Sequence, residues 1–230
     1  MEFTLRDSKS SLVYRYPFLY TLFLKIRYGI FYQDRYKMLA KHIKNNTSVF
    51  ELCPGDLVLY EGYLKNMNVH YGGIEIGESF VKNAKDKNID LIQGNVLKEN
   101  FTLSDYVIIQ GSLCQFYDDA LVLVGRMLDA AKSKVIINES IRSFGQSSIP
   151  IIKWAARRSI DPGTGHCMKR FDEDSLRLLG DKIKNTYGHM ISNIIYEKTD
   201  IHSFANIKGG GWDFQIVIIK KWITKKYYLG

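Results

Sequence analysis

Short apolar runs alternate with segments of helical periodicity between residues 45 and 140. The apolar runs predict five strands, at Ser48–Leu52, His70–Ile76, Asp90–Ile92, Asp105–Gln110 and Lys134–Asn138. The segments between them predict helices at Val58–Asn66, Glu78–Lys87 and Asp118–Ala131. Strands that alternate with helices indicate an α/β fold with a doubly wound, mostly parallel sheet. Because parallel crossovers are right-handed, we expect the carboxyl ends of these strands along one edge of the sheet.

The last third of the chain has a different pattern. A helix is predicted at residues 149–160, a Gly-rich loop at 161–167 and a second helix at 173–184. Two strands follow, Ile191–Thr199 and Trp212–Lys221, with no helical segment between them. Strands joined without a crossover helix pair antiparallel, so the sequence predicts a seven-stranded sheet that ends in a C-terminal antiparallel hairpin.

Residues 12–44 predict an N-terminal helical extension in which Pro17 marks a start or a break. Basic and aromatic side chains interleave along it. Such a segment could lid a ligand pocket or lie on a membrane surface, and it could equally pack on the sheet with its basic residues facing water. We therefore divide the chain into an extension at 1–44 and a sheet domain at 45–230, with a substrate-side insertion near 142–172.

The composition is that of a globular protein of 230 residues with a formal net charge of +8. A basic balance favours an anionic partner, although scattered lysines on a solvated surface explain the charge as well. The three cysteines, Cys53, Cys114 and Cys167, form no C-x-x-C pair, and so indicate neither a disulfide framework nor a metal site. The first residues show no secretory signal, so we expect a cytoplasmic protein with peripheral membrane contact as an option.

The stretch Val49 to Asp56, V-F-E-L-C-P-G-D, is the first candidate for ligand binding. It joins a strand to a turn with one glycine, and such loops bring backbone close to nucleotide-type ligands at the carboxyl end of a strand. Glu75 lies 24 positions after Glu51 (75 − 51), at the end of the second predicted strand. A carboxylate there can accept hydrogen bonds from both ribose hydroxyls, and dinucleotide enzymes use the same device.

These features together resemble the class I S-adenosylmethionine-dependent methyltransferases, which have a Rossmann-like fold. The resemblance rests on the acids Glu51 and Glu75 at the ends of the first two strands, on the order of motifs across residues 45–140, and on the terminal hairpin. It implies S-adenosylmethionine as the cofactor.

The residues that match the family's motifs are candidates for cofactor binding. Glu51 would accept hydrogen bonds around the ammonium group of the cofactor, and Gly55 would let the loop backbone approach it. Cys53 and Leu57 stand where the family prefers glycine. The set that the resemblance assigns to the cofactor is Glu51, Cys53, Gly55, Glu75, Ile76, Asn95, Val96, Gln110, Leu113 and Phe116.

The later members of this set have more specific expected roles. Ile76 would pack on the adenine face, and Asn95 would accept a hydrogen bond from the adenine amino group, although asparagine is also common in turns. Gln110 and Leu113 would flank the cofactor, and Phe116 would shield it.

Fewer residues suggest how an acceptor would bind. His166 is the candidate catalytic base, because imidazole titrates near neutral pH and the residue lies in the Gly-rich loop, but a surface histidine is the alternative. Arg142 and Arg170 are candidates to hold an anionic acceptor, and either could instead be solvated. Tyr32 completes the predicted substrate-binding residues.

Methyl transfer from S-adenosylmethionine to a small-molecule or lipid-like acceptor is the function that these residues favour. The alternative is a non-catalytic module that binds the cofactor or another ligand on the same fold. A nicotinamide-dependent oxidoreductase is disfavoured because no G-x-G-x-x-G sequence is present. Nucleic-acid methylation is disfavoured because no Asp- or Asn-Pro-Pro-aromatic motif follows the fourth strand. The sequence predicts neither the identity of the acceptor nor the oligomeric state.

Overall fold

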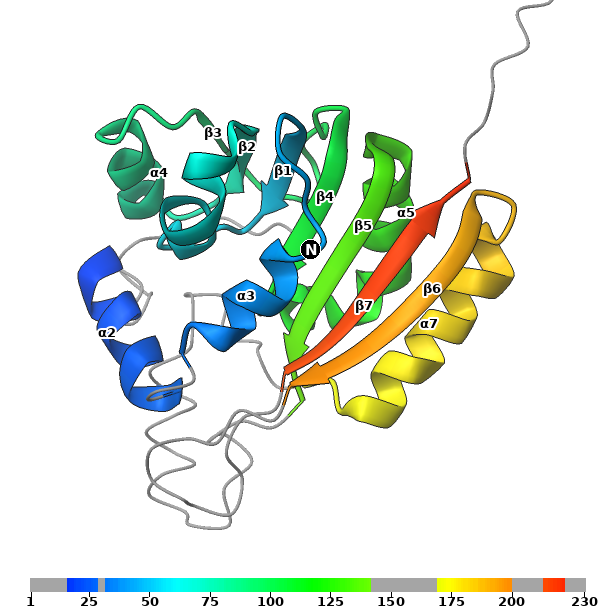
Figure 1. Cartoon of the computed structure of the whole chain (residues 1–230). Coiled ribbons are helices and arrows are strands. Elements are labelled where there is room, and N and C mark those ends of the chain that lie inside the picture. Colours follow the sequence, from blue (N-terminus) through cyan, green and yellow to red (C-terminus); the bar gives the residue numbers. More distant parts are fainter. Residues whose placement is uncertain (1–15, 29–31, 142–168, 200–212, 222–230) are drawn as a thin grey trace, which may run out of the picture.

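A seven-stranded sheet forms the centre of the structure, a computed structural model that describes residues 16–28, 32–141, 169–199 and 213–221 (Figure 1). The strands are β1 Ser48–Leu52, β2 His70–Glu75, β3 Leu91–Gln93, β4 Ser104–Gln110, β5 Ala131–Ser140, β6 Ile191–Thr199 and β7 Asp213–Lys220. Their order is β3-β2-β1-β4-β5-β7-β6. Strands β1 to β5 pair parallel, whereas β7 lies between β5 and β6 and pairs antiparallel with both. The predicted sheet and its antiparallel hairpin are therefore confirmed.

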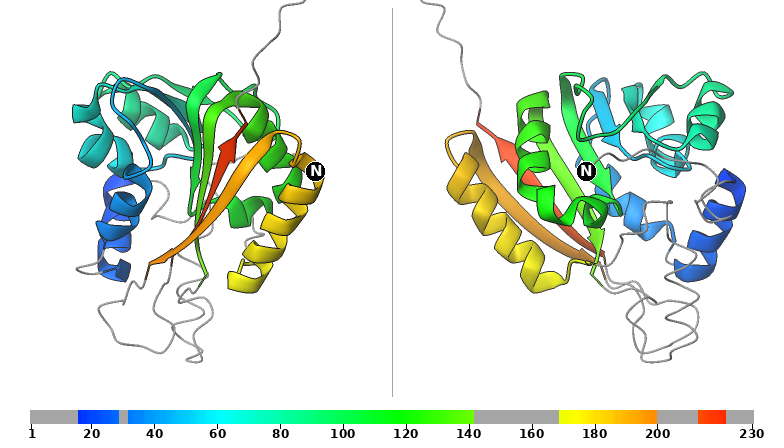
Figure 2. Two further views of the ribbon diagram at one scale, coloured as in Figure 1. Left: turned by 45° about the vertical axis from the view of Figure 1, so that its right-hand side comes forward. Right: turned by 180° about the vertical axis from the view of Figure 1, so that it is seen from behind.

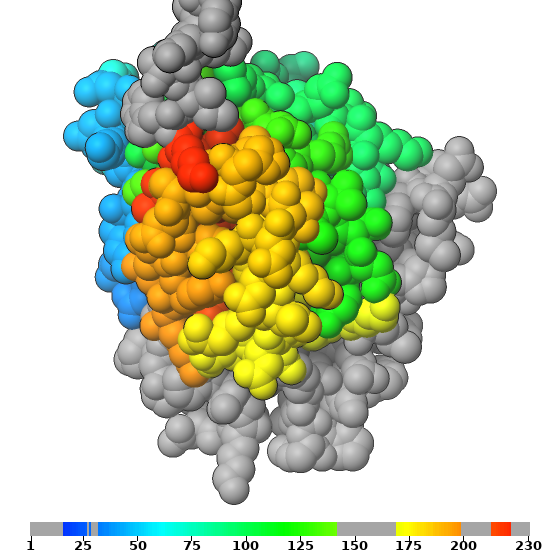
Figure 3. Space-filling model, turned by 90° about the vertical axis from the view of Figure 1, so that its right-hand side faces the viewer, coloured from blue at the N-terminus to red at the C-terminus, as the bar shows by residue number. Residues whose placement is uncertain are grey.

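Helices lie on both faces of the sheet (Figures 1 and 2). The longer helices are α2 Pro17–Tyr28, α3 Asp34–Ala40, α4 Glu78–Lys85, α5 Ala120–Ala130 and α7 Glu173–Tyr187. Three short helical segments are η3 Tyr60–Leu64, η4 Lys65–Met67 and η5 Leu113–Asp119. Helices α5 and α7 lie on one face, and α3 lies on the other. Figure 3 shows the outer edge of the sheet, where β6 and α7 form the surface.

The N-terminal extension differs from the prediction of one helical segment at residues 12–44. The structure has two helices there, α2 and α3, with residues 29–31 between them outside the described residues. The described residues Tyr32 and Gln33 form a turn immediately before α3. The division of the chain at residue 44 stays a prediction.

Two predicted helices are less regular than expected. Val58–Asn66 contains the π-helix η3 followed by the 3₁₀-helix η4, and Gly62 lies within the π-helical turn. The helix predicted at Asp118–Ala131 is present as α5, Ala120–Ala130, and its first two residues belong to the preceding 3₁₀ segment η5. The helix and the loop predicted at 149–160 and 161–167 lie outside the described residues.

The strands bury side chains on both faces, as their apolar sequences predict. In β4, Val107 and Ile109 join the core under α5 and α7, while Tyr106 and Ile108 join the core under α2 and α3. On the α3 face the strands change from apolar to polar at the carboxyl ends of β4 and β5 and at the amino end of the antiparallel β7. Gln110, Asn138 and Gln215 lie there in one row across β4, β5 and β7, because Gln110 pairs with Asn138 and Asn138 pairs with Gln215.

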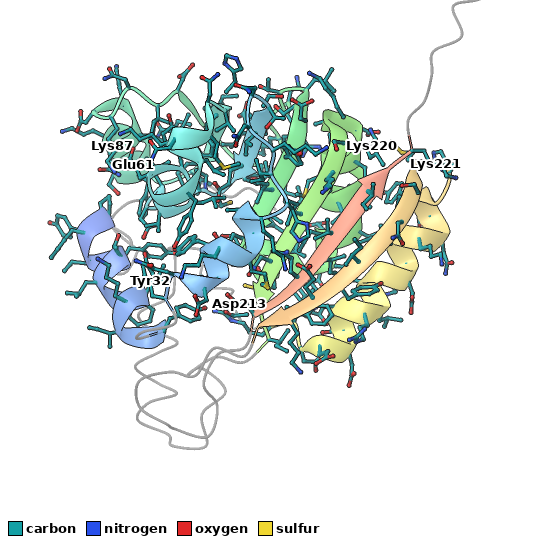
Figure 4. All side chains as sticks on the ribbon, viewed as in Figure 1. Tyr32, Glu61, Lys87, Asp213, Lys220 and Lys221 are labelled. Atoms are coloured by element: carbon teal, nitrogen blue, oxygen red, sulfur yellow. The ribbon has the colours of Figure 1, made fainter. Side chains whose placement is uncertain are left out.

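A buried ion pair fastens α3 to this polar edge. Arg35 Nε lies 3.2 Å from Asp213 Oδ2, and the two side chains are 5% and 0% exposed. The Arg35 guanidinium lies 4.4 Å from the centre of the Tyr28 ring, so it also contacts α2. Ser140 Oγ donates to Asp213 Oδ1 at 2.6 Å, and it therefore accepts from Tyr28 Oη at 2.5 Å. Figure 4 shows Asp213 at the start of β7 and Tyr32 near α2 and α3, along the same edge of the sheet.

Removing one member of this pair should destabilise the fold strongly. Asp213→Ala leaves the Arg35 guanidinium buried without its counter-ion, and we expect the free energy of unfolding to fall by about 3–5 kcal/mol. The double variant Arg35→Met, Asp213→Leu removes both charges and should regain most of this loss. Urea denaturation of the three proteins measures the effect, and a loss below about 1 kcal/mol for Asp213→Ala would contradict the assignment.

Candidate functional site

The loop after β1 has the backbone conformation of a glycine-rich loop. Cys53, Gly55 and Leu57 have φ values of 55°, 58° and 64°. A left-handed conformation is rare for side chains such as those of Cys and Leu. Leu57 is fully buried against Ala84, and this burial offsets the conformational cost of about 1–2 kcal/mol. The loop therefore keeps its path at the two positions where the sequence departs from glycine.

Glu75, at the end of β2, binds this loop through its carboxylate. Its Oε1 accepts hydrogen bonds from the backbone nitrogens of Ile76 and Gly77 at 2.8 and 2.9 Å. Its Oε2 accepts one from the nitrogen of Gly55 at 3.1 Å. Burial raises the pKa of Glu75, and these three donors act in the opposite direction by stabilising its charged form. Glu75, which was predicted to hold a ribose, thus holds the loop after β1 in place.

Glu51, at the carboxyl end of β1, is a buried acid in which only one carboxylate oxygen accepts a hydrogen bond from the described residues. The side chain is 2% exposed, and its Oε2 accepts a hydrogen bond of 2.6 Å from Tyr71 Oη. No described residue forms a hydrogen bond with its Oε1. Burial raises the pKa of Glu51 to about 7; the Tyr71 hydrogen bond opposes this shift, whereas the nearby acids Asp56 and Glu75 add to it. Glu51 is therefore poised to change charge near neutral pH.

A pocket opens in front of Glu51 on the α3 face of the sheet. Its lining comes from α2, α3, the loop after β1 and the end of β4: Tyr20, Leu24, Arg35, Tyr36, Glu51, Cys53, Pro54, Asp56, Leu59 and Gln110. Asp56 accepts a hydrogen bond of 2.9 Å from Thr21 Oγ1, and burial raises its pKa. The acids Glu51 and Asp56 lie in the pocket with Glu75 behind the loop, and they favour a cationic ligand.

Helix α2 covers the pocket. A Cβ atom built on Gly55 would lie 3.4 Å from the Tyr20 ring, so this ring occupies the space in front of the loop glycine. The Tyr20 ring in turn packs edge-on against Phe80 of α4, with the ring centres 5.5 Å apart. The remaining cavity is about 20 Å³, which is room for one water molecule. Among the described residues, this cavity is too small for a nucleotide-sized ligand while α2 stays in this position.

The structure brings three of the predicted cofactor residues together at the pocket. Glu51, Cys53 and Gln110 line it, and Gly55 lies beside it under Tyr20. The Gln110 Nε2 atom is buried and has no hydrogen-bond partner among the described residues, so a polar ligand atom would satisfy it.

Other predicted cofactor residues lie in different surroundings. Val96, Leu113 and Phe116 belong to the core on the α5 face, and the backbone nitrogen of Leu113 donates to Glu139 Oε1. Asn95 Oδ1 accepts a hydrogen bond of 2.9 Å from the nitrogen of Leu97, which is the turn role that its residue type favours. These contacts leave their cofactor roles as predictions.

The predicted acceptor residues are less concentrated. Tyr32 is buried beside Tyr36, with ring centres 5.4 Å apart, in the core next to the pocket. Arg170 Nη1 lies 3.4 Å from the sulfur of Cys114, away from the residues that line the pocket. Arg142 and His166 lie outside the described residues.

Seven of the pocket residues were not among the predicted site residues: Tyr20, Leu24, Arg35, Tyr36, Pro54, Asp56 and Leu59. Asp56 ends the stretch that was singled out, but nothing in the pattern shows that its side chain turns toward Thr21. Tyr20, Arg35 and Tyr36 belong to the basic, aromatic extension, which predicts a lid in general terms. Their interleaving with other aromatic residues of the extension gives no sign of which side chains point inward.

No protein-family model matches this sequence, and no curated protein matches it. A chain from the complex between the Haloferax volcanii Trm112 methyltransferase activator and a methyltransferase superposes with a TM-score of 0.63 and 11% identity, over 94% of this chain and 99% of that chain. An S-adenosylmethionine-dependent methyltransferase from Archaeoglobus fulgidus has a TM-score of 0.59 and 14% identity, over 88% and 99%. An S-adenosylmethionine-dependent methyltransferase from Thermotoga maritima superposes with a TM-score of 0.57 and 13% sequence identity, over 88% of this chain and 93% of that chain. The chain has the Rossmann-like fold of these methyltransferases.

The raised pKa of Glu51 predicts a pH-dependent stability. The folded protein holds a proton on Glu51 up to a pH of about 7, whereas the unfolded chain releases it near the ordinary value of 4.5. Stability contributed by the protonated form is therefore present at low pH and is lost as the pH rises through this window. The side chain in Glu51→Gln cannot titrate, so this variant is the reference. We expect the free energy of unfolding of the wild type, relative to that of the variant, to fall by about 3 kcal/mol as the pH rises from 4.5 to about 7.

Urea denaturation at a series of pH values measures this difference. Asp56 and Glu75 titrate in both proteins, so to a first approximation their contributions cancel. A difference that stays constant with pH would show that Glu51 is not held in its protonated form.

Proposed function

We propose that this protein transfers a methyl group from S-adenosylmethionine to a small-molecule or lipid-like acceptor. The observation that carries the proposal is the pairing of the buried Glu51 carboxyl group with a loop whose backbone stays left-handed at Cys53, Gly55 and Leu57. The fold alone would accommodate other ligands. Glu51 and the loop after β1 together suit a ligand whose cationic end lies near the carboxylate and which lies close to the loop backbone.

The residues of the pocket fit the chemistry of this cofactor. Glu51 and Asp56 would stabilise its cationic groups. Arg35 is the one cation among the described residues that line the pocket, and its Nε is already paired with Asp213. Glu75 keeps the loop in place and has acceptor capacity left for a ribose hydroxyl, because a carboxylate can accept about four hydrogen bonds and three are used.

The cofactor would supply a methyl group on a sulfonium, which transfers by in-line displacement. The chain's part in such a reaction is to align the reactants and exclude water, and a base is needed only for a protonated nucleophile. Gln110 offers an unsatisfied amide at the carboxyl end of β4, where it would orient a polar group of the acceptor or cofactor. Helix α2, which carries Tyr20 and Leu24, would move aside to admit the reactants.

A non-catalytic binding module is the second candidate. The Tyr20 ring in front of Gly55 favours it, as does the use of Glu75 for three backbone hydrogen bonds, because both leave little of the site open. The two candidates differ in whether a bound cofactor is turned over.

Titration calorimetry with S-adenosylmethionine tests the cofactor. A cation bound near Glu51 should lower its pKa and release a proton at pH 6.5, so the heat should depend on the ionisation enthalpy of the buffer. Glu51→Gln should bind about 1.5–3 kcal/mol more weakly and should lose this buffer dependence.

Glu61→Gln is the matched control, because it makes the same substitution on η3 outside the pocket lining and should leave binding unchanged. Absence of binding at millimolar cofactor would contradict the proposal. Tight binding without turnover of any acceptor would favour the second candidate.

The covering position of α2 gives a separate prediction. If Tyr20 must leave the space before Gly55, Tyr20→Ala should raise the affinity for S-adenosylmethionine by roughly three- to tenfold, since less contact is broken on opening. Phe18→Ala on the outer side of the same helix is the control and should have no such effect. Weaker binding by Tyr20→Ala would instead place this ring in contact with the ligand.

A further inference from the structure

Helix α2 has two apolar ridges on opposite sides. Tyr20, Leu24 and Tyr28 recur every four residues and face the pocket and the core. Phe18, Leu22 and Ile26 recur with the same spacing, and they are 73%, 42% and 67% exposed. An offset of two residues is about 200° around a helix, so the second ridge points away from the protein. A helix that is apolar on both sides at the surface needs an explanation beyond packing on the sheet.

Helix α2 and the N-terminal segment that contains it carry a positive net charge. Helix α2 has the sequence P-F-L-Y-T-L-F-L-K-I-R-Y, which contains no acid, and the Lys25 side chain is exposed next to the ridge. Residues 1–44 contain nine Lys and Arg against three Asp and Glu, a net charge of +6 out of the +8 of the whole chain. The positive charge of this protein is thus concentrated in the segment that contains α2.

We infer that the outer ridge of α2 docks on an anionic phospholipid bilayer. Aliphatic and aromatic side chains flanked by cations are the composition of helices that lie in the membrane interface, where apolar burial and attraction to anionic headgroups add. The ridge suits lipid better than nucleic acid, because Leu22 and Ile26 offer neither a hydrogen bond to a phosphate nor a ring for base stacking.

The geometry fits a helix lying on the surface of the bilayer. Twelve residues of α-helix extend about 18 Å, less than the roughly 30 Å of a bilayer core. Within the described part of the chain, no helix is both long enough and apolar enough to cross a membrane. The inner ridge stays packed over the pocket, so docking would place the predicted active site beside the lipid surface.

This inference rests on the exposed side of α2 and does not depend on the proposed methyl transfer. Vesicle binding can therefore be measured with the full chain and without any cofactor. If the protein fails to bind vesicles, the calorimetric test of the cofactor is unaffected. If it fails to bind the cofactor, the vesicle test is unaffected.

Cosedimentation with vesicles tests the docking. The protein should bind phosphatidylcholine vesicles that contain phosphatidylglycerol at least about tenfold more tightly than phosphatidylcholine alone, and added salt should weaken the binding. The double variant Phe18→Ser, Ile26→Ser should lose about tenfold or more in affinity for the anionic vesicles.

The matched control is Val122→Ser, Leu178→Ser, which removes two side chains that are 60% and 55% exposed on α5 and α7. Helix α7 lies at the opposite end of the molecule from α2 (Figure 1), so this variant should bind vesicles like the wild type. Circular dichroism and thermal unfolding confirm that both variants fold.

Three outcomes would overturn the inference. The first is a wild type that binds neither kind of vesicle, and the second is an equal loss in the two double variants. The third is that Phe18 and Ile26 mediate self-association or binding of single-stranded RNA, and vesicles are not bound. The outer ridge would then serve another partner. Size-exclusion chromatography and RNA titration detect these cases.

Discussion

The burial of the Arg35 guanidinium constrains this structure more than any other single interaction described. An uncompensated charge at 5% exposure would be prohibitive, so α3 must lie where Asp213 can face it. The same guanidinium contacts the Tyr28 ring, and Tyr28 reaches Asp213 through Ser140. One ion pair therefore fixes α2 and α3 to the start of β7. Because α2 carries Tyr20 and Thr21, it also determines what covers the loop after β1.

The loop after β1 shows how a departure from glycine can be tolerated. Cys53 and Leu57 keep the left-handed conformation, and Leu57 gains full burial in return. Glu75 adds three hydrogen bonds that fix the loop from behind. Side chains therefore hold this loop in place: Leu57 through its burial and Glu75 through its hydrogen bonds. In the proposed function the loop is thus preorganised, and α2 covers it.

Much of the fold follows from the sequence because its strands are marked locally. Ser48–Leu52 and Ile191–Thr199 have the predicted bounds, since apolar side chains on a parallel or antiparallel ladder leave a clear pattern. The π-helical turn at Tyr60–Leu64 was not predicted, because a helical spacing of apolar residues does not distinguish a π-turn from an α-helix. In the site, Glu51 and Gln110 were expected from the family resemblance, which assigns roles to residues at these strand ends. Arg35 and Asp56 were not, because their roles depend on the partners Asp213 and Thr21, which lie far from them in sequence.

The two ridges of α2 connect the pocket with the molecular surface. A helix of this length moves as one body, so displacement of Tyr20 from Gly55 also moves Phe18 and Ile26. Opening must break the Thr21–Asp56 hydrogen bond and the Tyr20–Phe80 contact, and it must expose Leu24. The outer ridge alone docks in the closed state; if α2 then opens, a lipid surface that also receives Leu24 would reduce the penalty for this exposure, because an apolar side chain would leave protein for hydrocarbon and not for water. In the proposed function, opening of the site and delivery of a lipid-like acceptor would then occur at the same place.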